Sequence, residues 1–170
     1  DSRIFIVVDL KKIDRPLSER IVYEDLLVEE IVSTANYFLG KGVPVDLVYY
    51  NNGINIVHGA SMKDFDDIYN LMAEIEFSSE EGIEEVMYPI FDEENTNNTF
   101  FIFSLELGSS LYEVLTKIHL MEKRIFVRYC EIDIEDDEVY NYKRMLMKQG
   151  IEIEKLEEES RREDDEGQDS

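Results

Sequence analysis

The sequence has little cysteine, proline or glycine and no tryptophan. Only one of its 170 residues is a cysteine, Cys130, so the chain cannot form an intramolecular disulfide. A single thiol also excludes the paired cysteines of zinc and redox motifs. A reducing compartment, the cytoplasm, therefore fits this sequence best.

Positive charge is scarce, because 17 Lys and Arg residues stand against 40 Asp and Glu residues, for a net charge of −23. Such a surface repels phosphate groups, so we expect neither nucleic acid nor an anionic membrane as a partner. The longest apolar runs, 4–8 and 100–103, are far shorter than the roughly 20 residues that a membrane helix needs. No direct membrane contact is expected from this segment.

Apolar side chains are nevertheless sufficient for a core, at 44% of the residues. We expect one folded domain over residues 1–156. Residues 157–170, EEESRREDDEGQDS, contain no apolar side chain and are expected to form a disordered acidic tail. The chain opens at Asp1, without Met and close to a buried-type strand, so we expect it to be a piece of a longer protein.

Alternating patterns along the chain predict an α/β fold. The five apolar residues of 4–8 predict a strand covered on both faces, and a helical pattern then runs from Pro16 to Gly40. Strands at 45–50 and 54–58 are separated by Asn51-Asn52-Gly53, a hairpin signal that requires antiparallel pairing. Further elements follow in turn: helices at 65–75 and 83–90, a strand at 99–105, a helix at 111–118, a strand at 124–130, a helix at 138–148 and a strand at 151–153. We predict a doubly wound, mostly parallel sheet with one antiparallel edge strand, in a three-layer sandwich.

This order of elements resembles the von Willebrand factor A fold, which is Rossmann-like. The run YEDLLVEEIVSTANYFLGKGVPVDLVYYNNG more narrowly resembles the bacterial family called domain of unknown function 58. That family implies a domain belonging to a longer, membrane-anchored chain. Relatives are often encoded beside MoxR-type AAA+ ATPases, so the resemblance also implies such an ATPase as a partner.

The same resemblance implies a metal-ion-dependent adhesion site that is degenerate here. Active domains bind Mg²⁺ or Mn²⁺ through an Asp-x-Ser-x-Ser loop, a later Thr and a later Asp. The first Asp is Asp9, but the two Ser positions hold Lys11 and Ile13, which offer no side-chain oxygen. The Thr-bearing loop corresponds to Ser78 and Ser79, and the strand end that usually reads Thr-Asp-Gly is Ser104-Leu105-Glu106. We expect no bound metal and no cofactor, and we expect the ammonium of Lys11 to supply positive charge to Asp9 instead.

Asp9, Lys11, Ser79 and Glu106 are the expected partner-binding residues at this vestigial site. A different interpretation of the acids is a divalent-metal-dependent hydrolase that uses Asp9, Glu106, Glu131 and Asp133 at carboxyl ends of strands. A solvated acidic rim is the simpler explanation in so acidic a chain. A phosphoacceptor role for Asp9 needs a late Lys, whereas Glu131, Asp133 and Glu135 follow the strand at 124–130.

No other motif predicts catalysis. Gly40-Lys41-Gly42 follows a helix and precedes a strand, the reverse of the order in a phosphate loop, so it is interpreted as a helix end. His58 and His119 lack partners at useful spacing, and Cys130 is expected to be a small buried residue. We predict a non-enzymatic protein-binding domain, the soluble part of a larger bacterial protein. The alternatives are the hydrolase and a metal-dependent adhesion module.

Overall fold

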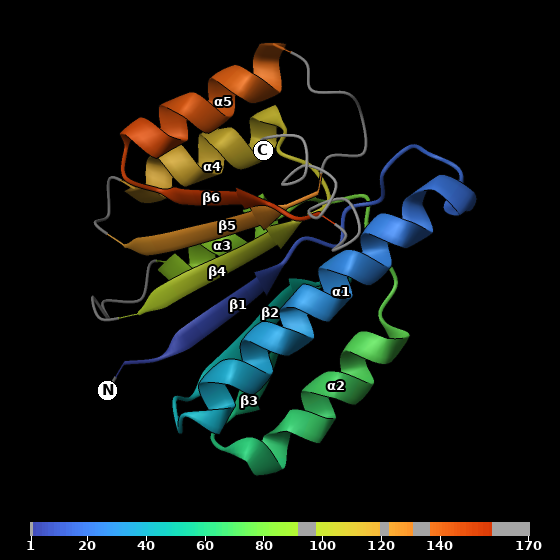
Figure 1. Ribbon diagram of the computed structural model, residues 1–170, viewed down its shortest axis with the longest axis vertical. Helices are drawn as coiled ribbons and strands as arrows, with labels where there is room; N and C mark the ends of the chain where they lie inside the picture. The colour runs from blue at the N-terminus through green and yellow to red at the C-terminus, as the bar shows by residue number, and fades with distance from the viewer. Residues whose placement is uncertain (1, 92–97, 120–122, 131–136, 158–170) are drawn as a thin grey trace, which may run out of the picture.

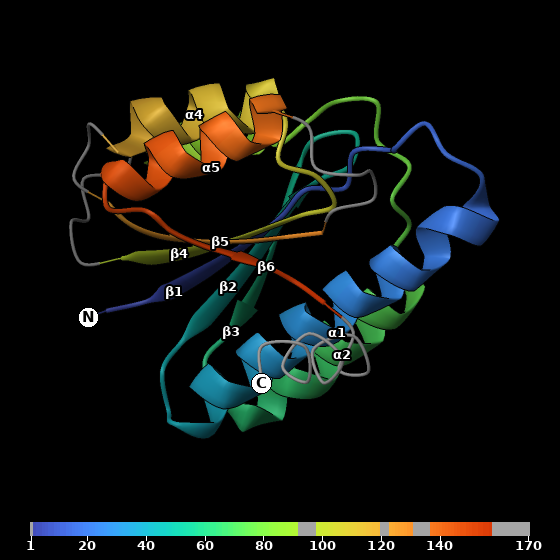
Figure 2. The same cartoon turned by 45° about the horizontal axis from the view of Figure 1, so that its top comes forward.

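A computed structural model describes residues 2–91, 98–119, 123–130 and 137–157 of the chain. Within these residues a six-stranded sheet has the order β3-β2-β1-β4-β5-β6 and carries helices on both faces (Figures 1 and 2). The predicted α/β architecture is confirmed. Of the predicted acidic tail, 157–170, all but Glu157 lies outside the described residues.

The centre of the sheet is β1 (Ile4–Val8), whose five side chains are all buried. It runs parallel to β2 (Val45–Tyr50) on one side and to β4 (Thr99–Ser104) on the other. A strand in this place is covered by helices on both faces, which is why it has no polar alternation. The predicted central position of this strand is confirmed.

The hairpin prediction is also confirmed. β3 (Ile54–Gly59) pairs antiparallel with β2 and forms one edge of the sheet. The turn between them places Asn52 at φ 52° and Gly53 at φ 131°, backbone conformations that Asn and Gly tolerate best.

The other side of the sheet continues in parallel through β5 (Arg124–Tyr129) to the edge strand β6 (Glu152–Lys155). The last strand was predicted at 151–153 and begins one residue later. Ile151 is excluded because its N–H donates to Leu146 O, and Gly150, at φ 86°, closes the preceding helix.

Among the described residues, three helical elements cover one face of the sheet and three cover the other. Figure 2 shows α1 (Leu17–Gly40) and α2 (Phe65–Glu74) on one side, with α4 (Ser109–His119) and α5 (Asp137–Lys148) on the other. The short helix η1 (Met62–Asp64) precedes α2, and α3 (Glu84–Phe91) packs with α4. None of the described helices is both long enough and apolar enough to cross a membrane.

Two helix boundaries are informative. Ile75 was predicted within a helix but is extended, at φ −68° and ψ 143°, so α2 ends at Glu74. α1 ends at Gly40, and Gly42 follows at φ 76°, as the interpretation of this glycine pair as a helix end requires.

Alternate residues of the strands point to opposite faces of the sheet and pack into two separate hydrophobic cores. Phe5 and Val7 pack on the side of α3, α4 and α5, whereas Ile4, Ile6 and Val8 pack on the side of α1 and α2. The parallel strands β1, β2, β4 and β5 have their carboxyl ends on the same side of the sheet. The loops that follow them therefore meet there, which is where ligands bind in open α/β sheets.

Candidate functional site

Asp9 lies at the carboxyl end of β1, next to the end of β4. Its backbone N–H donates to Phe103 O at 2.9 Å, which continues the pairing of the two strands by one residue. Its half-buried carboxylate accepts two hydrogen bonds, from the Lys11 N–H to Oδ1 at 3.1 Å and from the Ser104 hydroxyl to Oδ2 at 3.1 Å. Two chain segments that are 95 residues apart in sequence are thus joined through one carboxyl group.

Ser104 ends β4 and is almost completely buried, with 2% of its surface exposed. Its Oγ lies 2.8 Å from Glu106 O as well as 3.1 Å from Asp9 Oδ2. A hydroxyl has one proton, so it can donate to only one of these acceptors at a time. The protonation state of Asp9 therefore decides how this group of hydrogen bonds is arranged.

Burial raises the pKa of Asp9 to about 6, from its ordinary value of 3.8. The hydrogen bonds from Lys11 and Ser104 lower this pKa, and the nearby carboxylate of Glu84 raises it. The Lys11 charge also lowers it, as the smallest of these causes. At neutral pH Asp9 is therefore ionised, although its buried surroundings favour the protonated carboxyl group.

Lys11 contacts Asp9 through its backbone. Its side chain is exposed, and the ion pairs among the described residues do not include one between the Lys11 ammonium and Asp9. Lys11 stabilises the loop through the hydrogen bond from its backbone N–H to Asp9, whereas its charge lowers the pKa of Asp9 only weakly.

Ser79 joins the loop after β1 to the segment between α2 and α3. Its N–H donates to Leu10 O at 3.0 Å, and its carbonyl accepts from the Lys12 N–H at 2.8 Å, in the manner of a short parallel bridge. Its hydroxyl donates to Glu81 O at 3.0 Å, within its own loop. The residue therefore positions two loops through its backbone, while its side chain is satisfied locally.

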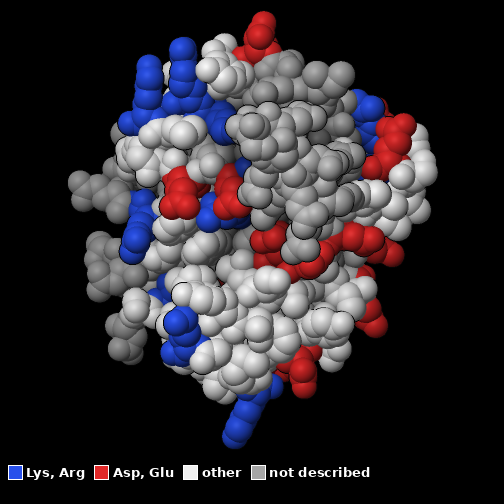
Figure 3. Space-filling view, in the orientation of Figure 1, with Lys and Arg blue, Asp and Glu red and all other residues white. Residues whose placement is uncertain are grey.

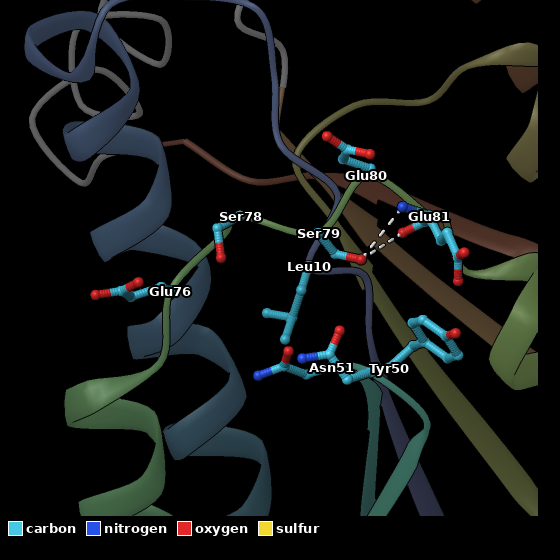
Figure 4. Close-up of a pocket in the computed structure, with 9 residues that line it drawn as sticks. Leu10, Tyr50, Asn51, Glu76, Ser78, Ser79, Glu80 and Glu81 are labelled. Carbon is cyan, nitrogen blue, oxygen red and sulfur yellow. Dashed lines mark hydrogen bonds between the residues drawn. The ribbon is translucent and has the colours of Figure 1, made fainter.

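Beside Ser79 lies a cavity of about 420 Å³ with a mainly polar lining (Figure 4). It is bounded by the loop after β1, the β2–β3 turn and the α2–α3 segment; the lining residues are Leu10, Tyr50, Asn51, Asn52, Glu76, Ser78, Ser79, Glu80 and Glu81. Hydrogen bonding to the nearby carboxylate of Glu81 raises the pKa of Tyr50, with smaller contributions from desolvation and from the charges of Glu81 and Glu85. Among charged side chains the lining contains acids alone, and it suits a ligand group that carries positive charge.

The structure brings some of the predicted site residues together and separates others. Asp9, the Lys11 backbone and Ser104 form one hydrogen-bonded group, to which Glu106 contributes only backbone atoms while its side chain is exposed. Ser79 is attached through backbone pairing, and Ser78 lines the cavity. We call the surface formed by Asp9, Lys11, Ser79 and Glu106, with the adjoining cavity, the carboxyl-end face.

Two predicted positions of the vestigial metal site belong to the core. Leu105 is 2% exposed and packs on the side of α1, and Ile13 is a half-buried neighbour of the same core. Among the described residues no three His, Cys, Asp or Glu side chains converge as a metal site would require. The acids Glu131, Asp133 and Glu135 lie outside the described residues.

Ser104 was not among the predicted site residues. The sequence carried a signal for this residue, because Ser104 holds the Thr position of the Thr-Asp-Gly strand end that the resemblance to the von Willebrand factor A fold implies. Its burial and its bond to Asp9 come from the close packing of β1 beside β4, which the sequence pattern does not specify.

The lone histidines lie away from this group, whereas Cys130 adjoins it, because the Cys130 N–H donates to Ser104 O at 3.1 Å. His58 Nδ1 is 2.9 Å from Asp46 Oδ1, and because β3 is antiparallel this pair lies at the opposite end of the sheet from Asp9. His119 is the last residue of α4. Cys130 is fully buried, as predicted, and burial raises the pKa of its thiol to about 12, with a smaller contribution from Glu30.

Comparison with solved structures supports a von Willebrand A-like fold. The conserved hypothetical protein BatB from Bacteroides thetaiotaomicron superposes with a TM-score of 0.54 at 10% identity, over 92% of each chain. The human COPII-coat protein Sec24c gives 0.52 at 13% identity, over 91% of this chain and 29% of that one. Proximal thread matrix protein 1 from the mussel byssus gives 0.51 at 9% identity, over 90% of this chain and 42% of that one. No protein-family model and no curated protein sequence matches the chain.

Proposed function

We propose that this chain is a non-catalytic protein-binding domain whose partner docks on the carboxyl-end face. The observation that carries the proposal is the state of Asp9, whose half-buried carboxylate has a raised pKa although two donors reach it. A group that a fold holds ionised against its surroundings is a candidate functional group. A positive charge from a partner would remove the penalty of ionising Asp9.

The charge of the neighbouring cavity favours the same kind of partner. Glu76, Glu80 and Glu81 line it, and its described lining includes no Lys or Arg. Interfaces pair potentials of opposite sign, so we propose that the partner surface presents Lys or Arg side chains to this face.

We do not propose catalysis, because the hydroxyl and thiol groups near this face are hydrogen-bonded within the protein or buried. The hydroxyl of Ser79 donates to a backbone carbonyl, and that of Ser104 lies between Asp9 and a backbone carbonyl. The Cys130 thiol is buried with a raised pKa. A nucleophile needs an adjacent base or a lowered pKa, and it must be accessible to a substrate. Ser104 has a neighbouring carboxylate in Asp9 but is only 2% exposed, and the pKa of Cys130 is raised rather than lowered.

The proposed setting is a larger bacterial protein, anchored in the membrane, with this domain in the cytoplasm. The proposed partner is a MoxR-type AAA+ ATPase. The support for both is the resemblance of the run around the second strand to the family called domain of unknown function 58, whose relatives are often encoded beside such ATPases.

Binding of the full 170-residue chain to the MoxR-type ATPase of the same genome tests this proposal. We expect Glu106→Lys to weaken binding about tenfold or more in a calorimetric titration, because it reverses a charge on the docking face. The matched control is Glu29→Lys, the same charge reversal at an exposed position of α1 that does not line the cavity, where less than a twofold change is expected. Failure of the ATPase to bind, or an equal loss in both variants, would contradict the proposal.

A further inference from the structure

The outer side of α5 is an apolar and basic groove on an acidic protein. Val139, Tyr142 and Leu146 pack inward from this helix. On its outer side a cavity of about 520 Å³ is lined by Tyr140, Lys143, Arg144, Met147 and Lys148, which we call the α5 groove. The spacing of these five residues at three and four positions places them along one stripe of the helix.

The apolar part of the groove is exposed. Tyr140 and Met147 each have 55% of their surface accessible. A tyrosine and a methionine seven positions apart lie two helical turns apart on one face, with the stems of Lys143 and Arg144 between them. Exposed apolar side chains in a concave, polar-rimmed setting mark interaction sites.

The basic side chains of the groove form no ion pair with the described residues. Within the described part of the chain Lys143, Arg144 and Lys148 form no ion pair, although acids outnumber bases by 40 to 17 in the sequence. Arg144 and Lys148 are four residues apart, a like-charge spacing that destabilises a helix by about 0.2 to 0.5 kcal/mol. Figure 3 shows Lys and Arg side chains gathered over the region that α5 occupies in Figure 1.

The helix dipole accounts for only part of this arrangement. A cation in the last turn is stabilised by the negative end of the helix, and Lys148 is the last residue of α5. The dipole does not account for Lys143, more than a turn earlier, or for the exposure of Tyr140 and Met147 beside the cations.

We propose that the α5 groove binds an acidic segment of a partner protein, one that packs apolar side chains against Tyr140 and Met147 and sets carboxylates on the three cations. Charge complementarity selects this occupant, because the groove is positive and apolar at once. The groove lies on the side of α5 opposite to the residues that pack inward, and it shares no lining residue with the cavity of the carboxyl-end face, so one molecule can use both surfaces. Figure 1 shows α5 as an outer element of the fold.

Other occupants fit the groove less well. An anionic bilayer is a broad surface, and a chain with a net charge of −23 is repelled by it. The chain's own segment 158–170 is acidic but brings no apolar side chain to Tyr140 and Met147. A second copy that docked groove to groove would place the same cations against one another, which is unfavourable.

Panning a random twelve-residue peptide library against the full chain tests the proposal. We expect the enriched peptides to be acidic and to share an aromatic or aliphatic residue. A synthetic copy of the consensus should bind Lys143→Glu/Arg144→Glu at least tenfold more weakly, as should Tyr140→Ser/Met147→Ser. The charge-matched control is Lys41→Glu/Lys63→Glu, two exposed lysines at the end of α1 and in η1, where less than a twofold change is expected. Circular dichroism verifies that each variant is folded, and Lys143→Gln/Arg144→Gln replaces any that is not.

Each contrary outcome overturns the proposal. If the enriched peptides are not acidic, or if the consensus peptide binds the α5 variants and the control variant equally, the α5 groove is not the peptide-binding site. Binding to phosphatidylserine vesicles that is lost in the α5 variants assigns the groove to a membrane. Self-association in light scattering that is lost in the same variants assigns it to a second copy. Peptide binding that appears only after removal of residues 158–170 assigns it to the chain's own terminus.

Discussion

Asp9→Asn is expected to raise the free energy of unfolding by about 3 kcal/mol at pH 7. Burial raises the pKa of Asp9 from 3.8 to about 6, so the folded protein resists ionisation of this group more than the unfolded chain does. A shift of about two pKa units corresponds to this free energy, because each unit is worth about 1.4 kcal/mol. Asparagine is neutral at every pH and avoids the penalty. The midpoint temperature should rise by roughly 6 to 12 °C in a domain of this size.

The gain should depend on pH in a defined direction. Since the folded pKa of Asp9 lies above the unfolded value, its contribution to stability is fully present below about pH 4 and is lost as the pH rises through 6. The wild-type protein and Asp9→Asn should therefore be nearly equal in stability at pH 4 and differ most at pH 7. Denaturant titrations at several pH values measure the difference, and the many other acids cancel between the two proteins.

The asparagine can keep the hydrogen bonds of the site. Its amide oxygen can accept from the Lys11 N–H, and its NH₂ can donate to Ser104 Oγ, which then donates to Glu106 O. Glu106→Gln is the matched control, because it makes the same exchange on an exposed side chain and should change stability by less than about 0.5 kcal/mol. A loss of stability in Asp9→Asn, or the same difference at pH 4 and pH 7, would contradict this account of Asp9.

Cys130 in the folded protein is expected to react with thiol reagents at least about a thousandfold more slowly than in the unfolded chain. Burial raises its pKa from 9.0 to about 12, which lowers the thiolate fraction at neutral pH by about that factor. The side chain is also fully buried, and its Sγ lies 3.7 Å from Tyr23 O. A chromogenic disulfide reagent followed by absorbance gives the rate.

The control for Cys130 is the same reaction in concentrated guanidinium chloride, where the thiol is exposed. Labelling of the native protein at a rate close to that of the unfolded chain would show that the thiol is accessible and activated. That result would make Cys130 a candidate nucleophile and would contradict a non-catalytic role.

The fold could be predicted from the sequence where local patterns are unambiguous. Five consecutive apolar residues at Ile4–Val8 require burial on both faces, and Asn52-Gly53 permits only a hairpin. Boundaries were predicted less well because tertiary contacts decide them. Ile151 is apolar and fits a strand pattern, yet its N–H closes the end of α5.

The site was only partly predictable for a similar reason. Asp9 follows a buried strand, so its position at the carboxyl end could be expected from the sequence alone. Its contacts with Lys11 and Ser104 depend on a loop conformation and on the register of β1 against β4. A sequence pattern predicts which residues have ligand oxygens, but it does not predict that Lys11 acts through its N–H.

The most direct test of a metal-independent docking face is the thermal midpoint of the protein in millimolar Mg²⁺, compared with EDTA and with a sodium salt of matched ionic strength. We predict that Mg²⁺ shifts the midpoint no more than the sodium salt does, because general screening acts on any chain as acidic as this one. A site saturated a hundredfold above its dissociation constant would add about 2.7 kcal/mol and raise the midpoint by roughly 5 to 10 °C. A shift of that size, specific to Mg²⁺ and abolished by Asp9→Ala, would contradict the account and establish a metal-dependent adhesion site at Asp9.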